Sequence, residues 1–336
     1  MSGPKGVAIV TGAAQGLGRA ISVRLAEDGF DVAVNDVFSN SGKLETLVEE
    51  IQAKGRSSSK HIADVSQEEA VKKMVEEVVK THGGLDVMVA NAGVTGRPGV
   101  PFGQIPADEW DRVMGVNGRG TFLCYKYAGM QMVKQGRGGR IIGASSIAGK
   151  QGMMMQGPYC ASKFAVRGLT QAAALEFGPH GITVNSYAPG AIDTPLLIAA
   201  SVTGDPSEII KKSIEKSAMK RIGVPDDISN LVSFLACKES QFITGQSVYN
   251  SATRTVSGPQ TIIKHGVGPR DCRIYVDDRT FNICDHRRIV RSQAQPSVRL
   301  VSYYKQTLQP KNLCLVSCTG SLSLYKIVYL AFGHVV

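Results

Sequence analysis

The stretch VAIVTGAAQGLG, residues 7–18, decides which fold this sequence predicts. Val7–Thr11 is a short run of β-forming apolar residues, and Leu17 and Leu25 fall on one stripe of the helical pattern that follows the glycines. Between a strand and a helix, glycines let the backbone approach a pyrophosphate, whose charge is attracted to the helix N-terminus. The spacing G-x-x-x-G-x-G with Arg19 after it excludes a P-loop, which needs a lysine there. A merely structural turn would explain the glycines equally well if they stood alone.

A second expected strand, residues 30–37, carries Asp36 near its end. This carboxylate comes eighteen residues after Gly18 and is placed to accept both hydroxyls of an adenosine ribose. It would also repel a 2′-phosphate, and neither Val37 nor Phe38 supplies a compensating positive charge. The sequence therefore favours NAD over NADP as cofactor, with a simple turn aspartate as the alternative.

Helical faces and apolar strands then alternate along the chain. Apolar residues repeat at helical spacing over residues 44–51 and 71–78, and β-rich runs cover residues 61–65 and 85–90. Strands and helices that alternate at this pace imply right-handed βαβ units around a parallel sheet. We therefore expect an α/β fold with a Rossmann-type, doubly wound parallel sheet, formed as a single domain by residues 1–250.

Several of the expected strands end in residues suited to contact a ligand, because open α/β sheets bind ligands at these ends. Asp64 and Val65 form a candidate lip over an adenine, although Asp64 would serve equally well as the cap of the next helix. A later strand runs into Asn91-Ala92-Gly93. The β run around residue 185 ends in the loop 188–194, which is suited to cover a bound ring.

The stretch SSIAGKQGMMMQGPYCASK, residues 145–163, carries the candidate chemistry. Tyr159 and Lys163 are four residues apart in a helical pattern that continues to about residue 177, so their side chains share one face. A nearby cation favours the phenolate, and moving a tyrosine pKa from about 10 to near 7 takes about 4 kcal/mol. We expect Tyr159 to exchange protons at neutral pH, with Ser146 at the end of the preceding strand. A surface pair at chance spacing is the alternative.

A long helix is expected over residues 107–134, and Asn117 lies within it among glycines at positions 115, 118 and 120. Such glycines cost helix stability, so a local kink with a backbone role and a tolerated irregularity are equal alternatives. The three methionines at 153–155 are expected to form an apolar pocket wall, with core packing as the alternative. Cys124 and Cys160 have no histidine close in sequence, so we expect them to pack rather than to act as nucleophiles.

Together these motifs resemble the short-chain dehydrogenase/reductase family over residues 6–249. The matching motifs are, in order, Thr11 to Gly18, Asn91-Ala92-Gly93, Asn117, Ser146, Tyr159, Lys163 and Pro189-Gly190. The resemblance implies a Rossmann-type domain, a nicotinamide cofactor and reversible hydride transfer between a carbonyl and an alcohol. It implies that Tyr159 is the acid/base and that Lys163 binds the nicotinamide ribose and lowers the pKa of Tyr159. It further implies that Ser146 polarises the substrate carbonyl and that Asn117 holds a water in the proton relay.

The resemblance also implies which residues bind the cofactor, which we expect to be NAD, and it implies no metal ion. The expected cofactor-binding residues are Gly12, Gln15, Gly16, Leu17, Gly18, Asp36, Asp64, Val65, Asn91, Ala92, Gly93, Tyr159, Lys163, Pro189, Gly190, Ile192 and Thr194.

Residues 11–36 and 159–197 look like those of diacetyl/acetoin reductases, also called butanediol dehydrogenases. A methionine-lined pocket without an obvious carboxylate clamp suits such a small uncharged ketone. The leading hypothesis is NAD(H)-dependent interconversion of a small ketone and a secondary alcohol among diacetyl, acetoin and 2,3-butanediol. The alternatives are another small secondary alcohol or a sugar alcohol as substrate, and a catalytically impaired isoform with a basic interaction tail. The family resemblance suggests a homo-oligomer, a tetramer or dimer, built partly on the helices at 107–134 and 159–177.

Composition and charge set the broad class of protein. A hydrophobic content of 43% is typical of a soluble chain with a sizeable core, and no segment resembles a membrane span or a leader peptide. The seven cysteines are odd in number and scattered, so we expect a reducing, cytoplasmic location. Of the net charge of +10, residues 251–336 carry +8, from twelve basic and four acidic residues. The nearly neutral body therefore gives no indication of nucleic-acid binding.

Residues 251–336 depart from the family. Relatives finish the last strand with a Val-Asp-Gly-Gly type segment, whereas here Ser247-Val248-Tyr249 leads into Asn250-Ser251-Ala252. One explanation is a translated intron or altered splice product in which the last strand is displaced or lost. Four tail cysteines have irregular spacings that do not favour a zinc site, namely Cys272, Cys284, Cys314 and Cys318. The tail's apolar runs are short and unpatterned, so we expect it to lack an independent fold.

Overall fold

The computed structural model describes residues 4–201 and 205–250, in which strands and helices alternate as expected. The strands are β1 (Val7–Thr11), β2 (Asp31–Asp36), β3 (Ser58–Ile62), β4 (Val87–Ala90), β5 (Gly139–Ala144), β6 (Ile182–Pro189) and β7 (Ser247–Asn250). The α-helices are α1 (Gly16–Glu27), α2 (Ser41–Ala53), α3 (Glu68–His82), α4 (Ala107–Val113), α5 (Gly120–Gln135), α6 (Gly157–Phe177), α7 (Pro195–Ala199), α8 (Ser207–Lys216) and α9 (Pro225–Ala236). None of these described helices is long and apolar enough to cross a membrane.

All of these strands run parallel in one sheet, in the order β3-β2-β1-β4-β5-β6-β7. The strand order changes direction at β1, which pairs with β2 on one side and with β4 on the other. Sheets of this kind bind ligands outside the carboxyl ends of the strands at such a switch point. The expected Rossmann-type, doubly wound fold is therefore confirmed, and the glycine turn after β1 lies at the switch point.

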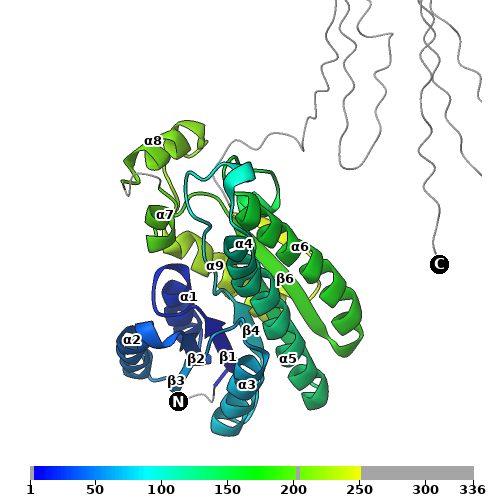
Figure 1. The fold of residues 1–336 in the computed structure, drawn as a ribbon. Coiled ribbons are helices and arrows are strands. Elements are labelled where there is room, and N and C mark those ends of the chain that lie inside the picture. Colours follow the sequence, from blue (N-terminus) through cyan, green and yellow to red (C-terminus); the bar gives the residue numbers. More distant parts are fainter. Residues whose placement is uncertain (1–3, 202–204, 251–336) are drawn as a thin grey trace, which may run out of the picture. The chain divides into compact units, whose positions relative to one another are not determined.

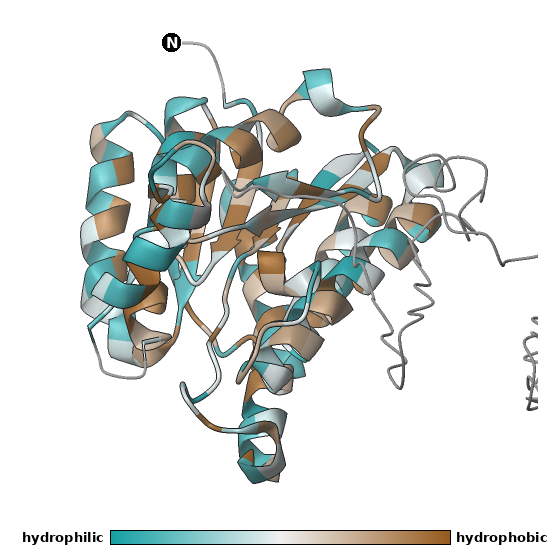
Figure 2. Cartoon of the chain, turned by 90° about the horizontal axis from the view of Figure 1, so that it is seen from above, coloured by the Kyte–Doolittle hydropathy of each residue, from teal (hydrophilic) through white to brown (hydrophobic). Residues whose placement is uncertain are grey.

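Helices cover both faces of the sheet (Figure 1). One hydrophobic core contains Val10 of β1 together with residues of α1, α2 and α9, and the other contains Ile9 together with residues of α3, α5 and α6. Consecutive residues of β1 thus belong to opposite cores, as the two-residue period of a strand requires. Figure 2 shows the result from above: apolar residues gather along the sheet and the helix sides that face it.

Two expected boundaries are wrong. β3 ends at Ile62 rather than at Val65, because its partner β2 ends at Asp36 and the ladder stops with the pair Asp36↔Ile62. The expected helix at 107–134 is divided into α4, a π-helical turn at Met114–Arg119, and α5. Its glycines therefore lie at an irregular turn of the helix, as both alternatives expected.

The last strand is present, so the expectation that it is displaced or lost is wrong. β7 pairs with β6 from Ser186↔Ser247 to Pro189↔Asn250. The Asn250 carbonyl accepts from Gly190 N at 3.1 Å, and Asn250 Nδ2 donates to the Asp227 carbonyl of α9 at 2.8 Å. These two bonds join the end of β7 to the loop after β6 and to α9. The expectations about the fold and cysteines of residues 251–336 lie outside the described residues.

Two histidines share one hydroxyl at the amino-terminal end of β3. Ser59 Oγ lies 2.9 Å from His61 Nε2 and 2.8 Å from His82 Nε2, and His61 Nδ1 lies 3.5 Å from Glu77 Oε2. A hydroxyl has a single hydrogen, so a consistent network has His82 donating to Ser59, Ser59 donating to His61, and the His61 Nδ1–H facing Glu77. Burial lowers the pKa of both histidines, against the opposing effects of Glu77 on His61 and of Asp31 on His82. Both histidines are therefore neutral in this arrangement.

We predict that mild acid destabilises the protein through this cluster. A histidine whose pKa is lowered by folding stays neutral while the unfolded chain takes up a proton near pH 6.5, so stability falls as the pH drops through that value. Urea unfolding between about pH 7.5 and 5.5 should show a decreasing free energy of unfolding, and His82→Gln should reduce the decrease. His180→Gln, at an exposed position, is the control. An equal pH dependence of the free energy of unfolding in the wild type, His82→Gln and His180→Gln would contradict the prediction.

Candidate active site

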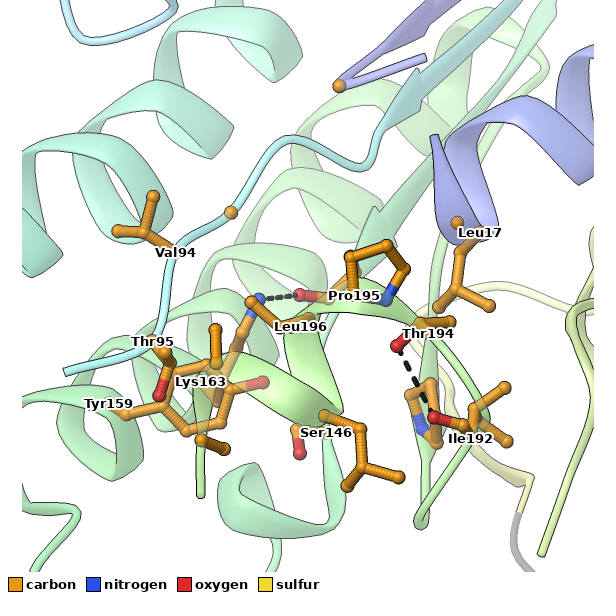
Figure 3. Close-up of a pocket in the computed structure, with 18 of the residues that line it drawn as sticks. Leu17, Val94, Thr95, Ser146, Tyr159, Lys163, Ile192, Thr194, Pro195 and Leu196 are labelled. Carbon is orange, nitrogen blue, oxygen red and sulfur yellow. Dashed lines mark hydrogen bonds between the residues drawn. The ribbon is translucent and has the colours of Figure 1, made fainter. Parts of the chain in front are cut away.

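One cavity of about 1380 Å³ is lined by all but one of the residues predicted to bind cofactor or to react. These lining residues are Gly12, Gln15, Gly16, Leu17, Gly18, Asp36, Asp64, Val65, Asn91, Ala92, Gly93, Ser146, Tyr159, Lys163, Pro189, Gly190, Ile192 and Thr194. The volume exceeds the roughly 300–1,000 Å³ common for a site that holds one small molecule, so a dinucleotide and a substrate fit together. Figure 3 shows the group around Tyr159 and Lys163 facing the group around Leu17 and Thr194.

The glycine turn brings α1 into direct contact with the end of β1. Gly12 has a φ of 63°, and a Cβ on Gly18 would lie 2.1 Å from the Gly12 carbonyl oxygen. Gln15, the N-cap residue of α1, makes no capping hydrogen bond with its side chain. The first N–H groups of α1 are therefore left to bind an anion at the edge of the cavity, which fits the pyrophosphate of a dinucleotide.

Partly buried side-chain hydrogen bonds of Asn91 hold this turn in place. Its Nδ2 donates to the carbonyls of Thr11 at 2.8 Å and Gly12 at 3.1 Å, and its Oδ1 accepts from the Tyr187 hydroxyl at 2.7 Å. Thr11 Oγ1 in turn accepts from the backbone N–H groups of Asn91 and Ala92, both at 3.0 Å. Tyr187 is fully buried in β6. The network therefore joins the ends of β1, β4 and β6 beneath the cavity.

Asp36 lies where the ribose-binding carboxylate was expected, at the end of β2. Its Oδ2 accepts from Ala14 N at 3.1 Å, and its Oδ1 accepts from Val37 N and Asn40 Nδ2, both at 2.9 Å. The side chain is thus fixed beside the glycine turn while remaining on the cavity wall. Asp64 also lines the wall, but it is not the cap of α3, whose N-cap residue is Gln67.

Tyr159 and Lys163 lie on successive turns of α6, with Lys163 Nζ 5.5 Å from the centre of the Tyr159 ring. Lys163 is buried, and its Nζ donates to the Ala144 carbonyl at 2.8 Å. Burial lowers the pKa of Lys163 to about 8. Burial also raises the pKa of Tyr159, although a hydrogen bond with Ser146 opposes the rise. For the chain by itself, the expected lowering of the Tyr159 pKa is therefore wrong, because desolvation of the phenolate dominates.

Ser146 follows β5 and caps the short 3₁₀ turn Ile147–Gly149. Its Oγ accepts from Ala148 N at 3.1 Å, which fixes the side chain and leaves the hydroxyl hydrogen available to another partner. Because its hydroxyl also interacts with Tyr159, the two hydroxyl groups are directed into the same part of the cavity.

Asn117 is the predicted residue that does not line the cavity. It is fully buried, and its Oδ1 accepts from Val94 N at 2.8 Å. Its Nδ2 donates to the Val94 carbonyl at 2.9 Å and to Ser162 Oγ at 3.0 Å, and Ser162 donates to the Tyr159 carbonyl at 2.8 Å. Both amide hydrogens are therefore engaged. The side chain fixes the start of α6, and a bound water would have to be held by the backbone of the π-helical turn.

The three methionines at 153–155 line the cavity, as predicted. Met155 has a φ of 60°, a left-handed conformation that costs a non-glycine residue about 1–3 kcal/mol and is often found at functional sites. Cys160 Sγ accepts from Met153 N at 3.3 Å and so ties this wall to α6. Cys124 is buried, and burial raises its pKa to about 12, which agrees with a packing role.

Sequence reasoning missed several residues of the cavity wall, namely Thr95, Arg97, Arg112, Tyr187 and Leu196. Thr95 lies beside Tyr159 (Figure 3). Thr95 and Arg97 belong to an irregular loop after β4, where no periodic pattern indicates which side chains face a ligand. The only available signal was that the loop follows the Asn91-Ala92-Gly93 motif.

The fold and the matches to known proteins define an oxidoreductase. A family model described as enoyl-(acyl carrier protein) reductase matches residues 12–252. The chain belongs to the short-chain dehydrogenase/reductase family.

Curated relatives support the same assignment. A short-chain dehydrogenase/reductase of Armillaria gallica is 52% identical over 244 residues, which cover 72% of this chain and 93% of the relative. A 3-oxoacyl-[acyl-carrier-protein] reductase, FabG, of Staphylococcus aureus is 42% identical over 242 residues, which cover 72% of this chain and 95% of the relative.

Solved structures are similar over the same part of the chain. Acetoin dehydrogenase YohF from Salmonella typhimurium is 32% identical, with a TM-score of 0.66 and coverage of 75% of this chain and 96% of its own. An NAD⁺-bound xylitol dehydrogenase is 31% identical, with a TM-score of 0.69 and coverage of 75% and 100%. Enzymes named for different substrates thus match about equally well, so the family is established while the resemblance to acetoin reductases is not specific.

We predict that Tyr187→Phe weakens dinucleotide binding. The substitution removes the donor of Asn91 Oδ1, a partly buried acceptor, which should lower the free energy of unfolding by about 0.5–1.5 kcal/mol and loosen the glycine turn. Fluorescence titration with NADH should show a Kd raised about 5-fold or more, since a loosened turn costs about 1 kcal/mol of binding.

Tyr125→Phe is the matched control. Tyr125 is equally buried, but its hydroxyl bonds Thr170 Oγ1 at 3.0 Å, away from the turn. It should lose stability without a change in Kd. Equal Kd values for the two variants would contradict the positioning role of Tyr187.

Proposed function

We propose that this protein is an NAD(H)-dependent oxidoreductase that interconverts a small ketone and a secondary alcohol. The observation that carries the proposal is that Ser146, Tyr159 and Lys163 line the same cavity as the glycine turn. Carbonyl reduction needs a proton donor and a hydride carrier that meet at one carbon–oxygen bond. These residues supply the first and have space beside them for the second.

In this proposal the bound nicotinamide supplies or accepts the hydride, and the protein handles the proton. The raised pKa of Tyr159 keeps its hydroxyl protonated at neutral pH, ready to donate to the carbonyl oxygen. Ser146 donates to the same oxygen and polarises the carbonyl. Lys163 binds the nicotinamide ribose, and its ammonium stabilises the phenolate that forms. The role of Asn117 in proton transfer falls to its backbone, because its side-chain amide is engaged.

Diacetyl, acetoin and 2,3-butanediol are the leading substrates. The methionine wall gives the cavity an apolar side that suits a small uncharged molecule, and the similarity to an acetoin dehydrogenase supports this choice. A sugar alcohol is the second candidate, supported by the similar xylitol dehydrogenase. The third hypothesis, an impaired isoform, is less favoured because the proposed reacting residues share one cavity and β7 is formed.

NAD is the proposed cofactor because the Asp36 carboxylate is fixed on the cavity wall beside the glycine turn. One feature favours NADP as the alternative: Lys43 Nζ donates to Gln15 Oε1 at 2.9 Å, which brings a cation to the same turn. Lys43 does not line the cavity, whereas Asp36 does. The Asp36 carboxylate is therefore placed nearer than the Lys43 ammonium to the adenosine ribose of a bound dinucleotide.

We also propose that the protein is a homo-oligomer, a tetramer or dimer, in the cytoplasm. Large apolar side chains are exposed on the two long helices that the family resemblance implicates: Phe122 and Met130 on α5, and Phe164 and Leu175 on α6. Residues 164 and 175 are eleven apart, so they lie within about 20° of each other around the helix. Exposed apolar side chains gathered on neighbouring helices favour burial against another subunit.

Steady-state assays with diacetyl, acetoin, 2,3-butanediol and xylitol test the proposed reaction.

We predict that Tyr159→Phe lowers kcat by about 10²–10⁴-fold, because the transferable proton is lost while the ring is kept. Its Kd for NADH should not change. Tyr127→Phe, outside the cavity, is the control. Near-normal turnover by Tyr159→Phe would refute the assigned acid, and no turnover of any ketone or alcohol with either cofactor would refute the function.

We predict that the wild-type protein prefers NADH to NADPH. Asp36→Ala should narrow the preference by removing the charge that repels a 2′-phosphate, and Val37→Arg should shift it towards NADPH. Lys43→Gln should leave kcat/KM for NADH unchanged. A wild-type preference for NADPH would contradict the role assigned to Asp36. If Lys43→Gln abolished that preference, Lys43 would be the residue that binds the 2′-phosphate.

A further inference from the structure

Three charged residues stand next to the catalytic part of the cavity and take no part in the proposed reaction. Arg97 and Arg112 line the cavity, and Glu109 of α4 lies behind them with 4% of its surface exposed. A small hollow beside the cavity is lined by Arg97 and Glu109 together with Met155 and Gln156. Arg97 therefore borders the methionine wall just before α6, at the substrate end rather than the adenosine end.

Arg112 and the Arg97 backbone make the three hydrogen bonds that Glu109 accepts. Its Oε1 accepts from Arg97 N at 2.6 Å and from an Arg112 terminal nitrogen at 2.9 Å, and its Oε2 accepts from Arg112 Nε at 2.9 Å. The same Arg112 donates to the Thr95 carbonyl at 2.8 Å. The paired arginine holds the pKa of Glu109 below its usual range. The carboxylate is therefore ionised and balances the charge of Arg112.

The guanidinium of Arg97 carries the net positive charge of these three residues, because Arg112 and Glu109 balance each other. Its Nε is 3.7 Å from Glu109 Oε2, beyond hydrogen-bond distance, and the side chain is 61% exposed. Within the described part of the chain no hydrogen bond to this guanidinium is found. Its backbone, by contrast, is fixed by the buried Glu109. The result is a cation that contacts Glu109 only at ion-pair distance and makes no hydrogen bond within the described part of the chain, on a wall that is otherwise largely apolar.

We propose that Arg97 is a specificity-determining residue that binds a carboxylate, so that small oxo acids and hydroxy acids form a further substrate class of this enzyme. A guanidinium presents two parallel N–H groups that match a carboxylate, and such charge-assisted bonds are strong where water is partly excluded. The Arg112 bond to the Thr95 carbonyl holds the loop that carries Arg97 next to α4, and Thr95 in the same loop lies beside Tyr159 (Figure 3). Three acidic residues also line the cavity, namely Asp36, Asp64 and Glu215, and each would repel a carboxylate bound close to it.

This inference rests on the proposed ketone reductase and extends it beyond neutral diketones. The test compares acids with their methyl esters, which keep the carbon skeleton and remove the charge. The pairs are 2-oxobutanoate, acetoacetate and levulinate with the corresponding esters, which vary the distance from carboxylate to ketone. For at least one length, wild-type kcat/KM should be about 10-fold higher for the acid than for the ester, as expected for one charged hydrogen bond.

Arg97→Gln should lower kcat/KM for that acid by about 10- to 100-fold and leave the ester within about 2-fold. The unchanged ester shows that the variant folds and that its catalytic residues are intact. Arg137→Gln is the control, because Arg137 pairs with Asp86 and does not line the cavity. Equal rates for acid and ester at all lengths, or an equal effect of Arg97→Gln on both, would overturn the proposal.

Calorimetric titration of the acids and esters into the enzyme saturated with NAD⁺ separates this inference from the reaction itself. If no ketone is reduced, the ketone reductase assignment fails. Tighter binding of an acid than of its ester, lost in Arg97→Gln, would still support the carboxylate site. Equal binding of acid and ester would overturn it.

Discussion

The hydrogen bonds of the partly buried Asn91 side chain are the interactions on which the site most depends. They join the end of β4 to β1 through Thr11 and Gly12, and to β6 through Tyr187. β1 pairs with β4, but β4 and β5 separate β1 from β6, so no ladder hydrogen bond joins β1 to β6. A hydrogen bond of this kind contributes about 0.5–1.5 kcal/mol, so the three strand ends are favoured in one relative position. That position shapes the part of the cavity wall to which Gly12, Asn91 and Tyr187 belong.

The same constraint reaches the proposed catalytic residues through Gly93. A Cβ at this position would lie 3.2 Å from Asn117 Oδ1 and 3.3 Å from Lys163 Nζ, so the loop after β4 passes directly over both groups. Close packing of this kind excludes water from Lys163, whose side chain is buried. Burial, rather than pairing with an opposite charge, is therefore what shifts the pKa values of both residues. The packing at the carboxyl ends of the strands therefore also contributes the burial that shifts the pKa values of Tyr159 and Lys163.

Local patterns in the sequence predicted most of the fold and most of the candidate site. The glycine turn, Asp36, and the spacing of Ser146, Tyr159 and Lys163 each depend on neighbours within one strand–helix unit, and the structure brings them to one cavity. What the sequence could not predict depends on contacts across the fold. The glycines at 115–120 signalled an irregular helix, but not the close contact of Gly120 with Val65, whose Cγ2 would lie 2.7 Å from a Cβ on that glycine. The charge balance around Arg97 likewise requires the loop after β4 to meet α4.

The π-helical turn has a consequence for how this helix can change over generations. It holds one residue more than a regular turn, and the wider turn absorbs that residue, so α4 and α5 continue in nearly the register of one regular helix. Deleting a single codon within Met114–Arg119 would therefore restore a regular helix and leave Leu123, Ala128 and Met132 on the core side. A deletion within α5 itself would instead turn the side chains beyond it by about 100° relative to α4. The π turn is thus the part of this helix where the chain can change its length by one residue at little cost to the core, and Asn117 is the residue that such a change would displace.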